Sequence, residues 1–524
     1  MTESSHLASR GRRRPWFPLV ITALGALGVL GVFLKPELER NLTWWIASAI
    51  VGIVLVLQAL WFLVTPRFRW QTRLGGLAVG LLVAAGLKFS LRVNGTLDGT
   101  GLPKLAWKWS APRPALAGPV GAAGGPAAVD LGRVAEAAEV PQFFGPGRDG
   151  VVVGARLERD WKAHPPRELW RQPIGEGWSA FAVVGGQAYT QEQRGAEELV
   201  TCYDLFSGQL RWTHGDPVRF SQWQSGDGPH ATPTVVESRV YAYGATGLLN
   251  CLDARTGALI WQRAVLAEHQ LGNLEWGLSA SPLVLGDRVV VTGGRNKGAV
   301  LFAYDRLTGA PLWQGGDDSA TYASPLAATL AGREVILASH ARALTAHDPA
   351  TGAVLLEHAW GISKWPKASQ PVVVGGDRVL VSAGYGMGCL LLQVKAGAEG
   401  RLEAEEVWSN LKLKTQFNSV ARRGEHLYGL DDGKLCCVEI ASGERLWKEG
   451  RFASGQSLVV DDLVIVQSES GAVHLAGAQP SGFVEWGRLE ALSSKTWNHP
   501  VLAGRFLLVR NDREAVCYEL AVAP

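Results

Sequence analysis

The sequence predicts an all-β fold, an eight-bladed β-propeller of four-stranded antiparallel blades, preceded by three N-terminal transmembrane helices. Two offset repeats predict the propeller, and three long apolar stretches near the N-terminus predict the helices. The first repeat joins an acidic residue, a Thr-Gly or Ser-Gly step and a Trp. Its copies are CYDLFSGQLRW (202–212), CLDARTGALIW (251–261), AYDRLTGAPLW (303–313), AHDPATGAVLL (346–356), CVEIASGERLW (437–447) and a truncated CYEL (517–520).

These copies recur at intervals of roughly 40 to 50 residues, which is the period of propeller blades. Two longer gaps each hold a degenerate copy, one ending at Trp408 and one at Trp486, which brings the count to eight. The acidic side chain can accept hydrogen bonds from the following turn, and the Gly supplies positive φ. We expect the Trp to pack between blades. The predicted blade-packing motif comprises Asp204, Asp253, Asp305, Asp348, Trp212, Trp261, Trp313 and Trp447.

The second repeat is a small or polar residue, often followed by Pro, and then a β-branched run. Examples are ATPTVV (231–236), ASPLVL (280–285) and ASPLAA (323–328), and again there are eight. Pro is tolerated at the start of a strand because its missing N–H need not break a ladder there. The last unit lacks its outer strand, and RELWRQP (167–173) resembles that strand. We therefore expect the N-terminal edge of the domain to complete the final blade and remove both sheet edges.

Three apolar stretches of spanning length, about 17–34, 44–64 and 74–91, precede the propeller. Basic residues lie before the first stretch (Arg10, Arg12, Arg13, Arg14) and between the second and third (Arg67, Arg69, Arg73), whereas charges balance in the 35–43 loop. The positive-inside rule then makes residues 1–16 cytoplasmic. It puts everything after residue 92 in the periplasm, anchored to the bacterial inner membrane. A cleavable signal peptide is the alternative, but no small-residue cleavage site follows Leu34.

Residues 92–160 are predicted to hold an interfacial segment and a linker. NGTLDGTGLPKLAWKWS (94–110) is aromatic and basic, as segments at a membrane surface are, whereas residues 111–130 are rich in Pro, Ala and Gly and should form a flexible tether. PQFFGPGRDG (141–150) carries turn signals and is expected to lead onto the propeller rim. The propeller itself is assigned to 161–524.

Charge and cysteine content narrow the possible functions. The formal net charge is only +3, so no basic face for nucleic acid is implied. Four of the six cysteines fall at one repeat position, which other units fill with Ala, so they are expected to be packing thiols in small buried positions. The vicinal pair Cys436–Cys437 lies inside a predicted strand, where alternation sends the two side chains to opposite faces. The sequence shows no metal-spaced cluster of His and Cys.

The A-x-D-x-x-T-G-x-x-x-W repeat with its A-S-P strand starts resembles the pyrroloquinoline-quinone (PQQ) repeat. That superfamily includes the quinoprotein alcohol dehydrogenases and the outer-membrane assembly propeller BamB, and the resemblance covers roughly residues 141–524. More narrowly, the chain is similar to bacterial membrane-anchored PQQ-binding-like β-propeller proteins. The resemblance implies that dehydrogenase members hold PQQ and Ca²⁺ on the propeller axis, under a vicinal disulfide. Here the only vicinal cysteines lie in a repeat strand, and no Glu, Asn and Asp set can be matched residue by residue.

Propeller ligands usually bind where the innermost strands begin, at the mouth of the central channel, and the residues before those strands are polar and aromatic here. The candidate ligand-binding residues are Asp227, His230, Glu275, Trp276, Gln416, Asn418, Trp497 and Asn498, with Trp178, Tyr322, Trp365, Gln370, Gln456 and His499 at equivalent places. The simpler interpretation is that Ser, Thr and Asn cap strand ends there and that the Trp residues pack. No catalytic or metal-binding residue is assigned.

Three functions remain open from the sequence. The first is a non-catalytic, membrane-anchored binding or scaffold module with a protein partner in the cell envelope. The second is a quinoprotein oxidoreductase that uses PQQ with Ca²⁺, which requires carboxylates around an open axial pocket. The third is a small-ligand sensor at the channel mouth, although the cytoplasmic segments are too short for an output domain.

Overall fold

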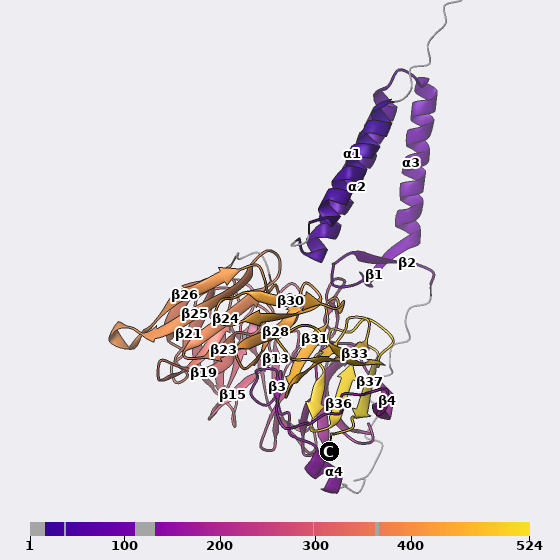
Figure 1. Ribbon diagram of the computed structural model, residues 1–524. Coiled ribbons are helices and arrows are strands. Elements are labelled where there is room, and N and C mark those ends of the chain that lie inside the picture. Colours follow the sequence, from indigo (N-terminus) through magenta and orange to yellow (C-terminus); the bar gives the residue numbers. More distant parts are fainter. Residues whose placement is uncertain (1–15, 36–37, 111–130, 297, 362–365, 524) are drawn as a thin grey trace, which may run out of the picture. The chain divides into compact units, whose positions relative to one another are not determined.

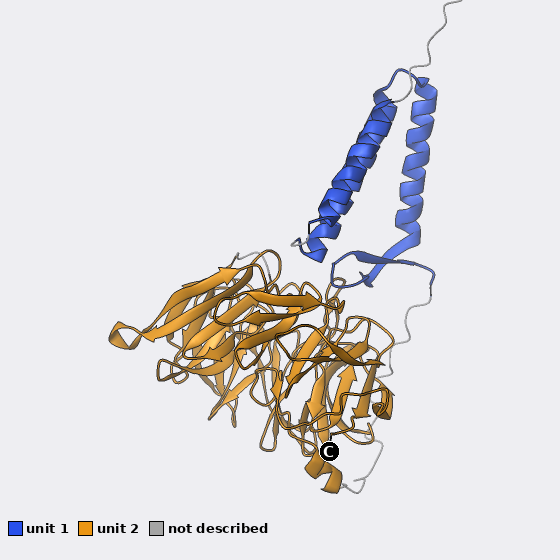
Figure 2. Ribbon diagram, in the orientation of Figure 1, with its two compact units in different colours: residues 1–111 blue, residues 112–524 orange. Residues whose placement is uncertain are grey.

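A computed structural model describes residues 16–35, 38–110, 131–296, 298–361 and 366–523. The chain divides into two compact units, residues 1–111 and 112–524 (Figure 2). Expectations for residues 1–15, for the tether at 111–130 and for Trp365 lie outside the described residues.

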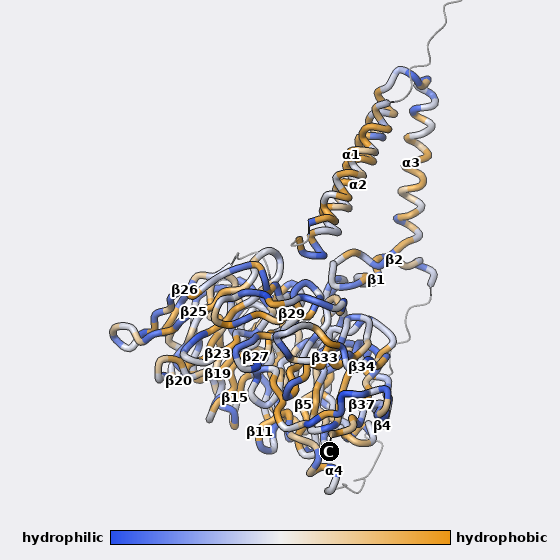
Figure 3. The backbone as a smooth tube through the Cα atoms, in the orientation of Figure 1, coloured by the Kyte–Doolittle hydropathy of each residue, from blue (hydrophilic) through white to orange (hydrophobic). Residues whose placement is uncertain are grey.

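The first unit holds three helices, α1 (Trp16–Phe33), α2 (Arg40–Val64) and α3 (Trp70–Ser90). Each is long and apolar enough to cross a membrane, and apolar residues make up most of each helix (Figure 3). α2 and α3 each begin four residues earlier than the sequence predicts, because the polar residues before the apolar stretches are also helical. A hairpin of β1 (Leu91–Thr96) and β2 (Pro103–Trp107) follows α3 directly.

The described residues of the second unit form an eight-bladed propeller of four-stranded antiparallel blades, as predicted (Figure 1); β3 (Val151–Val152) adds a fifth strand to one blade, and β4 (Arg167–Pro173) from the start of the domain completes another. The first four blades consist of β5 (Ala182–Val184), β6 (Gln187–Arg194), β7 (Glu197–Asp204) and β8 (Leu210–Asp216); β11 (Thr234–Val236), β12 (Arg239–Tyr243), β13 (Leu248–Asp253) and β14 (Leu259–Ala264); β15 (Leu283–Leu285), β16 (Arg288–Thr292), β17 (Leu301–Asp305) and β18 (Pro311–Gly315); and β19 (Leu326–Leu330), β20 (Arg333–Ser339), β21 (Ala343–His347) and β22 (Val354–Ala359).

The last four blades consist of β23 (Val372–Gly375), β24 (Arg378–Ala383), β25 (Gly388–Ala396) and β26 (Leu402–Asn410); β27 (Ala421–Arg423), β28 (His426–Asp431), β29 (Lys434–Glu439) and β30 (Arg445–Glu449); β31 (Gln456–Val460), β32 (Leu463–Gln467), β33 (Ala472–Gly477) and β34 (Glu485–Glu490); and β35 (Val501–Ala503), β36 (Phe506–Arg510), β37 (Glu514–Glu519) and β4 (Arg167–Pro173). Short elements outside this pattern are α4 (Leu131–Glu136), β3 (Val151–Val152), β9 (Ser221–Gln222), β10 (Gly226–Asp227), α5 (Val265–Glu268) and the 3₁₀ turn Ala398–Gly400.

Ring closure follows the sequence prediction. β4 pairs antiparallel with β37, from Glu514 opposite Pro173 to Glu519 opposite Arg167, so the N-terminal strand forms the outer edge of the eighth blade. The first strand of each blade is the innermost, since first strands of neighbouring blades contact one another, for example β5 with β11 and β27 with β31. Apolar side chains between adjacent sheets form the core, as in the cluster shared by the second and third blades around Tyr241 and Tyr304.

Each repeated Trp lies between its own blade and the turn of the next. The indole N–H of Trp212 donates to the carbonyl of Ala254 (2.9 Å), and Trp261 donates in the same way to Arg306 (3.1 Å). Trp313 donates to Pro349 (2.9 Å) and Trp447 to Gln479 (2.9 Å). The indole ring rests on the Gly of that turn, where φ is positive, as at Gly257 (φ 73°).

The acidic residue of the motif shapes that turn. A side-chain oxygen of Asp253 accepts hydrogen bonds from the backbone N–H (2.8 Å) and hydroxyl (2.7 Å) of Thr256, and Asp204, Asp305 and Asp348 make the same contacts in their own turns. The whole motif is therefore accounted for by packing between blades.

Substituting Gly257 by Ala tests this contact. A Cβ atom there would lie 2.4 Å from the Trp212 ring, whereas at Gly286, which also has positive φ (58°), it would meet nothing within 4 Å. Both variants carry the backbone cost of a left-handed Ala, about 1–2 kcal/mol. We expect Gly257→Ala to lose roughly a further 1–3 kcal/mol from overpacking. Thermal unfolding of both variants, followed by circular dichroism, measures the stability that each one loses. Equal losses of stability in the two variants would contradict the proposed packing.

Candidate functional site

The axis of the propeller is occupied by a segment of the chain itself, residues 140–152, which we call the axial segment. Its backbone pairs with the innermost strands of three blades. Val140 exchanges two hydrogen bonds of 2.8 Å with Val183, the carbonyl of Pro141 accepts from Val235 (2.7 Å), and β3 adds in parallel to β31 as a fifth strand. The sequence predicted this segment at the rim, and that prediction is wrong, because the inner strands offer unpaired backbone groups that the segment satisfies.

Arg148 anchors the axial segment from within. Its guanidinium is buried and donates to the carbonyls of Pro282 (2.8 Å) and Ser281 (3.1 Å) in the third blade. Gln370, before the first strand of the fifth blade, donates back to the carbonyl of Arg148. Burial lowers the pKa of Arg148 to about 9, so the guanidinium remains charged at neutral pH. This cation is held by backbone dipoles and the amide of Gln142 (3.3 Å).

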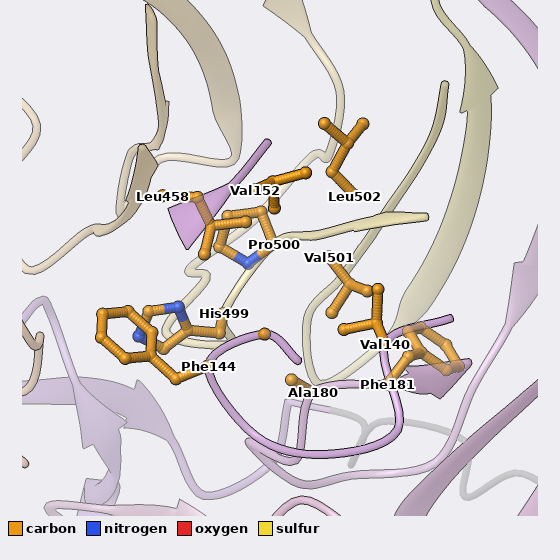
Figure 4. A pocket seen from close by; sticks show the side chains of 11 residues that line it. Val140, Phe144, Val152, Ala180, Phe181, Leu458, His499, Pro500, Val501 and Leu502 are labelled. Carbon is orange, nitrogen blue, oxygen red and sulfur yellow. The ribbon is translucent and has the colours of Figure 1, made fainter. Parts of the chain in front are cut away.

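Aromatic and aliphatic side chains fill the rest of this space. The rings of Phe144 and His499 meet edge to face with centroids 5.0 Å apart, and Figure 4 shows them beside Leu458, Val152 and Pro500. The cavity between these side chains measures about 10 Å³, at the lower limit for one water molecule. Burial lowers the pKa of His499 to about 3, which keeps the ring neutral.

Small hydroxyl residues accept hydrogen bonds that link neighbouring blades just before the innermost strands. The backbone N–H of Ala180 donates to the hydroxyl of Thr232 (3.1 Å), that of Thr232 to Ser281 (2.9 Å), and that of Ser281 to Ser324 (2.9 Å). Gln370 donates to Ser419 in the same way (3.2 Å). The second sequence repeat therefore links each of these blades to the next.

Two aromatic groups lie in the loops that precede the innermost strands. Trp497 contacts Trp178 (4.9 Å between centroids) and Phe417 (5.4 Å), with the ammonium of Lys495 4.1 Å from its ring centre. Its indole N–H donates to Glu469 (2.7 Å). These rings are half-buried, so a ligand or partner can reach part of them.

Trp276 belongs to the second aromatic group. It contacts the ring of Tyr322 (5.4 Å) and donates its indole N–H to Gln224 (3.2 Å), whereas the neighbouring Glu275 is exposed. The Gln224 contact could not be predicted from the sequence, because Gln224 lies 52 residues away in the previous loop.

The remaining candidates have structural partners. Asp227 pairs with Arg219 (2.9 Å) and accepts from Ser221 (2.6 Å) across the β9–β10 hairpin. Asn418 accepts from the backbone of Leu430 (3.2 Å), and Asn498 donates to the carbonyls of Ser179 (2.8 Å) and Gly177 (3.3 Å). Gln416 is half-buried beside Phe417. His230 contacts Phe220 edge to face, and burial lowers its pKa to about 4. The candidates thus fall into several separate clusters around the mouth.

The residues described do not fit PQQ with Ca²⁺. Two carboxylates near the mouth are engaged by basic groups, Asp318 by His340 (2.6 Å) and Asp431 by Arg445 (2.7 Å) and Lys448 (2.8 Å). Within the described ranges, His, Cys, Asp and Glu side chains nowhere gather in a group of three or more that could hold a metal. Calcium prefers several oxygen ligands around one point, and the axial segment lies in the space where a planar cofactor would need to sit.

All six cysteines are free and buried. Cys436 packs in the core shared by the fifth and sixth blades, and Cys437 in the core around the seventh, so the two side chains face opposite sides of β29 as predicted. A vicinal disulfide over a cofactor is therefore absent from this strand.

Two buried ionisable groups had no signal in the sequence. Burial raises the pKa of Glu198 to about 8, and burial lowers that of Lys367 to about 8. The Lys367 ammonium donates to the carbonyls of His340 (2.7 Å), Ala341 (2.6 Å) and Trp360 (2.8 Å). Shifted pKa values often mark functional sites, but Lys367 is fully engaged in holding one turn of the fourth blade.

Comparisons with known proteins agree with this architecture. The family model described as outer membrane protein assembly factor BamB matches residues 196–449. The BamB of Burkholderia pseudomallei (strain K96243) is 23% identical over 295 residues, which cover 53% of this chain and 70% of that protein.

Two solved structures share the fold. BamB from Moraxella catarrhalis has a TM-score of 0.51 at 18% identity and covers 68% of this chain and 99% of its own. Quinohemoprotein alcohol dehydrogenase from Comamonas testosteroni has a TM-score of 0.55 at 12% identity, covering 76% of this chain and 83% of its own. The chain therefore combines a BamB-like, PQQ-type repeat propeller of eight blades with three apolar N-terminal helices.

Proposed function

We propose that this protein is a membrane-anchored, non-catalytic binding or scaffold module whose propeller acts in the periplasm. One observation carries the proposal: residues 140–152 fill the axis of the propeller, with Arg148 bonded to the carbonyls of Ser281 and Pro282. A quinoprotein dehydrogenase needs that space for its cofactor.

The surfaces that remain available suit a protein partner. The Trp178–Trp497–Phe417 and Trp276–Tyr322 groups are half-buried aromatics rimmed by charged residues, a composition common in protein interfaces. A relative at 23% identity is named an outer membrane protein assembly factor, which supports a protein partner in the cell envelope. A small-ligand sensor is less well supported, because the mouth residues form separate clusters.

We further propose that the N-terminus is cytoplasmic and the propeller periplasmic. The three apolar helices support an anchor. Basic residues before α1 and between α2 and α3, set against a balanced loop between α1 and α2, support this orientation.

Titration calorimetry of the full-length protein with PQQ, with and without Ca²⁺, tests the proposed lack of a cofactor site. We expect no saturable heat, and no turnover in a dye-linked alcohol oxidation assay, because the axial segment occupies the space and the described acidic side chains do not gather into a metal-holding group. A quinohaemoprotein alcohol dehydrogenase run in parallel is the positive control. Binding at micromolar or tighter affinity, accompanied by turnover, would establish the dehydrogenase alternative and refute the scaffold proposal.

Cysteine labelling tests the orientation. The native cysteines are all buried, so background labelling should be low. Val153 in the propeller is 81% exposed, and Arg67 lies in the loop between α2 and α3. In cells with a permeabilised outer membrane, an impermeant maleimide should modify Val153→Cys but not Arg67→Cys until the inner membrane is opened. The reverse pattern would place the propeller in the cytoplasm.

A further inference from the structure

The β1–β2 hairpin of the first unit has two chemically different faces. Its register places Leu91 opposite Trp107 and Val93 opposite Leu105, so these four side chains share one face. Trp109 continues that face, with its ring stacked on Trp107 at 4.9 Å and 14°. Arg92, opposite Ala106, lies on the other face, together with Lys104 and Lys108 by alternation.

The apolar face lacks the cover that a soluble domain would give it. Leu105 is 58% exposed and Trp109 is 69% exposed, and Val93 and Trp107 are also exposed. A two-stranded hairpin is marginally stable in water, and exposed contiguous apolar surface of this kind marks a contact site.

The hairpin is held at the C-terminal end of α3. β1 begins at the residue after the helix, and Lys108 donates from its backbone to the carbonyl of Ser90 (2.8 Å) and from its ammonium to that of Lys88 (3.0 Å). Trp107 lies opposite Leu91, the residue directly after α3, and the β1–β2 hairpin lies at that end of the helix (Figure 1).

The loop of the hairpin reaches the N-terminal end of α2. Trp45 donates its indole N–H to the carbonyl of Thr100 (2.8 Å), and Arg40 and Asp98 are 3.7 Å apart. A short loop joins α2 to α3, so the two helices run in opposite directions. The N-terminal end of α2 is therefore on the same side as the C-terminal end of α3. The hairpin therefore bridges the two helix ends on one side of the membrane.

We propose that this hairpin is a membrane-interface element for lipid. It lays Leu91, Val93, Leu105 and Trp107 into the boundary of the acyl chains, and Arg92, Lys104 and Lys108 bind anionic phosphate headgroups. Trp is favoured at this depth of a bilayer, and basic side chains close to the surface attract anionic lipid. The exposed apolar face begins at the residue directly after the apolar helix α3, which argues for the bilayer as its occupant. The proposal rests on the proposed membrane anchoring of α1–α3.

Spin-label accessibility in the full-length protein, reconstituted into vesicles containing phosphatidylglycerol, tests the apolar face. Single cysteines replace Leu105, Trp107, Lys104 and Lys108, with Leu82→Cys in α3 as the lipid reference and Val153→Cys as the water reference. Both reference side chains are strongly exposed, at 71% and 81%. The measured quantity is the relaxation of each label by oxygen divided by its relaxation by a nickel chelate. We expect this ratio to be several-fold higher for labels at 105 and 107 than for labels at 104 and 108.

Three results would overturn the proposal. Equal accessibility at the four positions would show that the hairpin does not lie at the interface. Labels at 105 and 107 shielded from both reagents would show that protein covers this face, either the propeller or a partner. A Leu82 label that behaves like the Val153 label would show that the proposed anchoring itself is wrong, which the hairpin labels alone would not reveal.

The basic face has its own test. In the Arg92→Gln/Lys104→Gln variant, the label at Leu105→Cys should no longer move deeper when phosphatidylcholine vesicles are enriched in phosphatidylglycerol. The same label in the otherwise native chain should move deeper. The same response to phosphatidylglycerol in both proteins would overturn the assignment of these residues to headgroups.

Discussion

The rest of the propeller depends on how the backbone of its innermost strands is satisfied. Eight sheets in a ring leave eight inner edges facing the axis, and each unpaired buried backbone group there would cost about 1–3 kcal/mol. The axial segment meets part of this demand, because it pairs with Val183, Val235 and β31 in three of the eight blades. Phe144 and Arg148 then fill the space that remains. A ring that must be closed at its axis by its own chain has little room for a large axial cofactor.

This arrangement divides the molecule by role. The repeated Asp, Gly and Trp residues hold blade to blade, and the hydrogen bonds between Thr232, Ser281 and Ser324 link the starts of the inner strands. In the loops before those strands, Trp497 and Trp276 gather other aromatic side chains. The proposed partner-binding surfaces are these aromatic groups, which lie in loops outside the blade cores.

The sequence predicted the blade count, the closing strand and the three apolar helices, because each depends on local patterns that repeat. β4 has the bounds that RELWRQP suggested, and Trp212 and Trp261 lie between blades. The position of residues 141–150 could not be predicted in this way. Their turn signals describe local conformation only, whereas the contacts of Arg148 are with residues more than 130 positions away. Lys367 was missed for the same reason, since its carbonyl partners are set by tertiary packing.

Hydrogen–deuterium exchange of the full-length protein, read by mass spectrometry over residues 140–152, tests most directly whether the channel is closed by its own chain. The account predicts that the Val140 amide, and the inner-strand amides that bond to the segment, such as Val459, exchange as slowly as the central strands of the blades. It also predicts no change when PQQ and Ca²⁺ are added. Rapid exchange across this segment, or release of it by PQQ, would show that the axis is open to a cofactor and contradict the account.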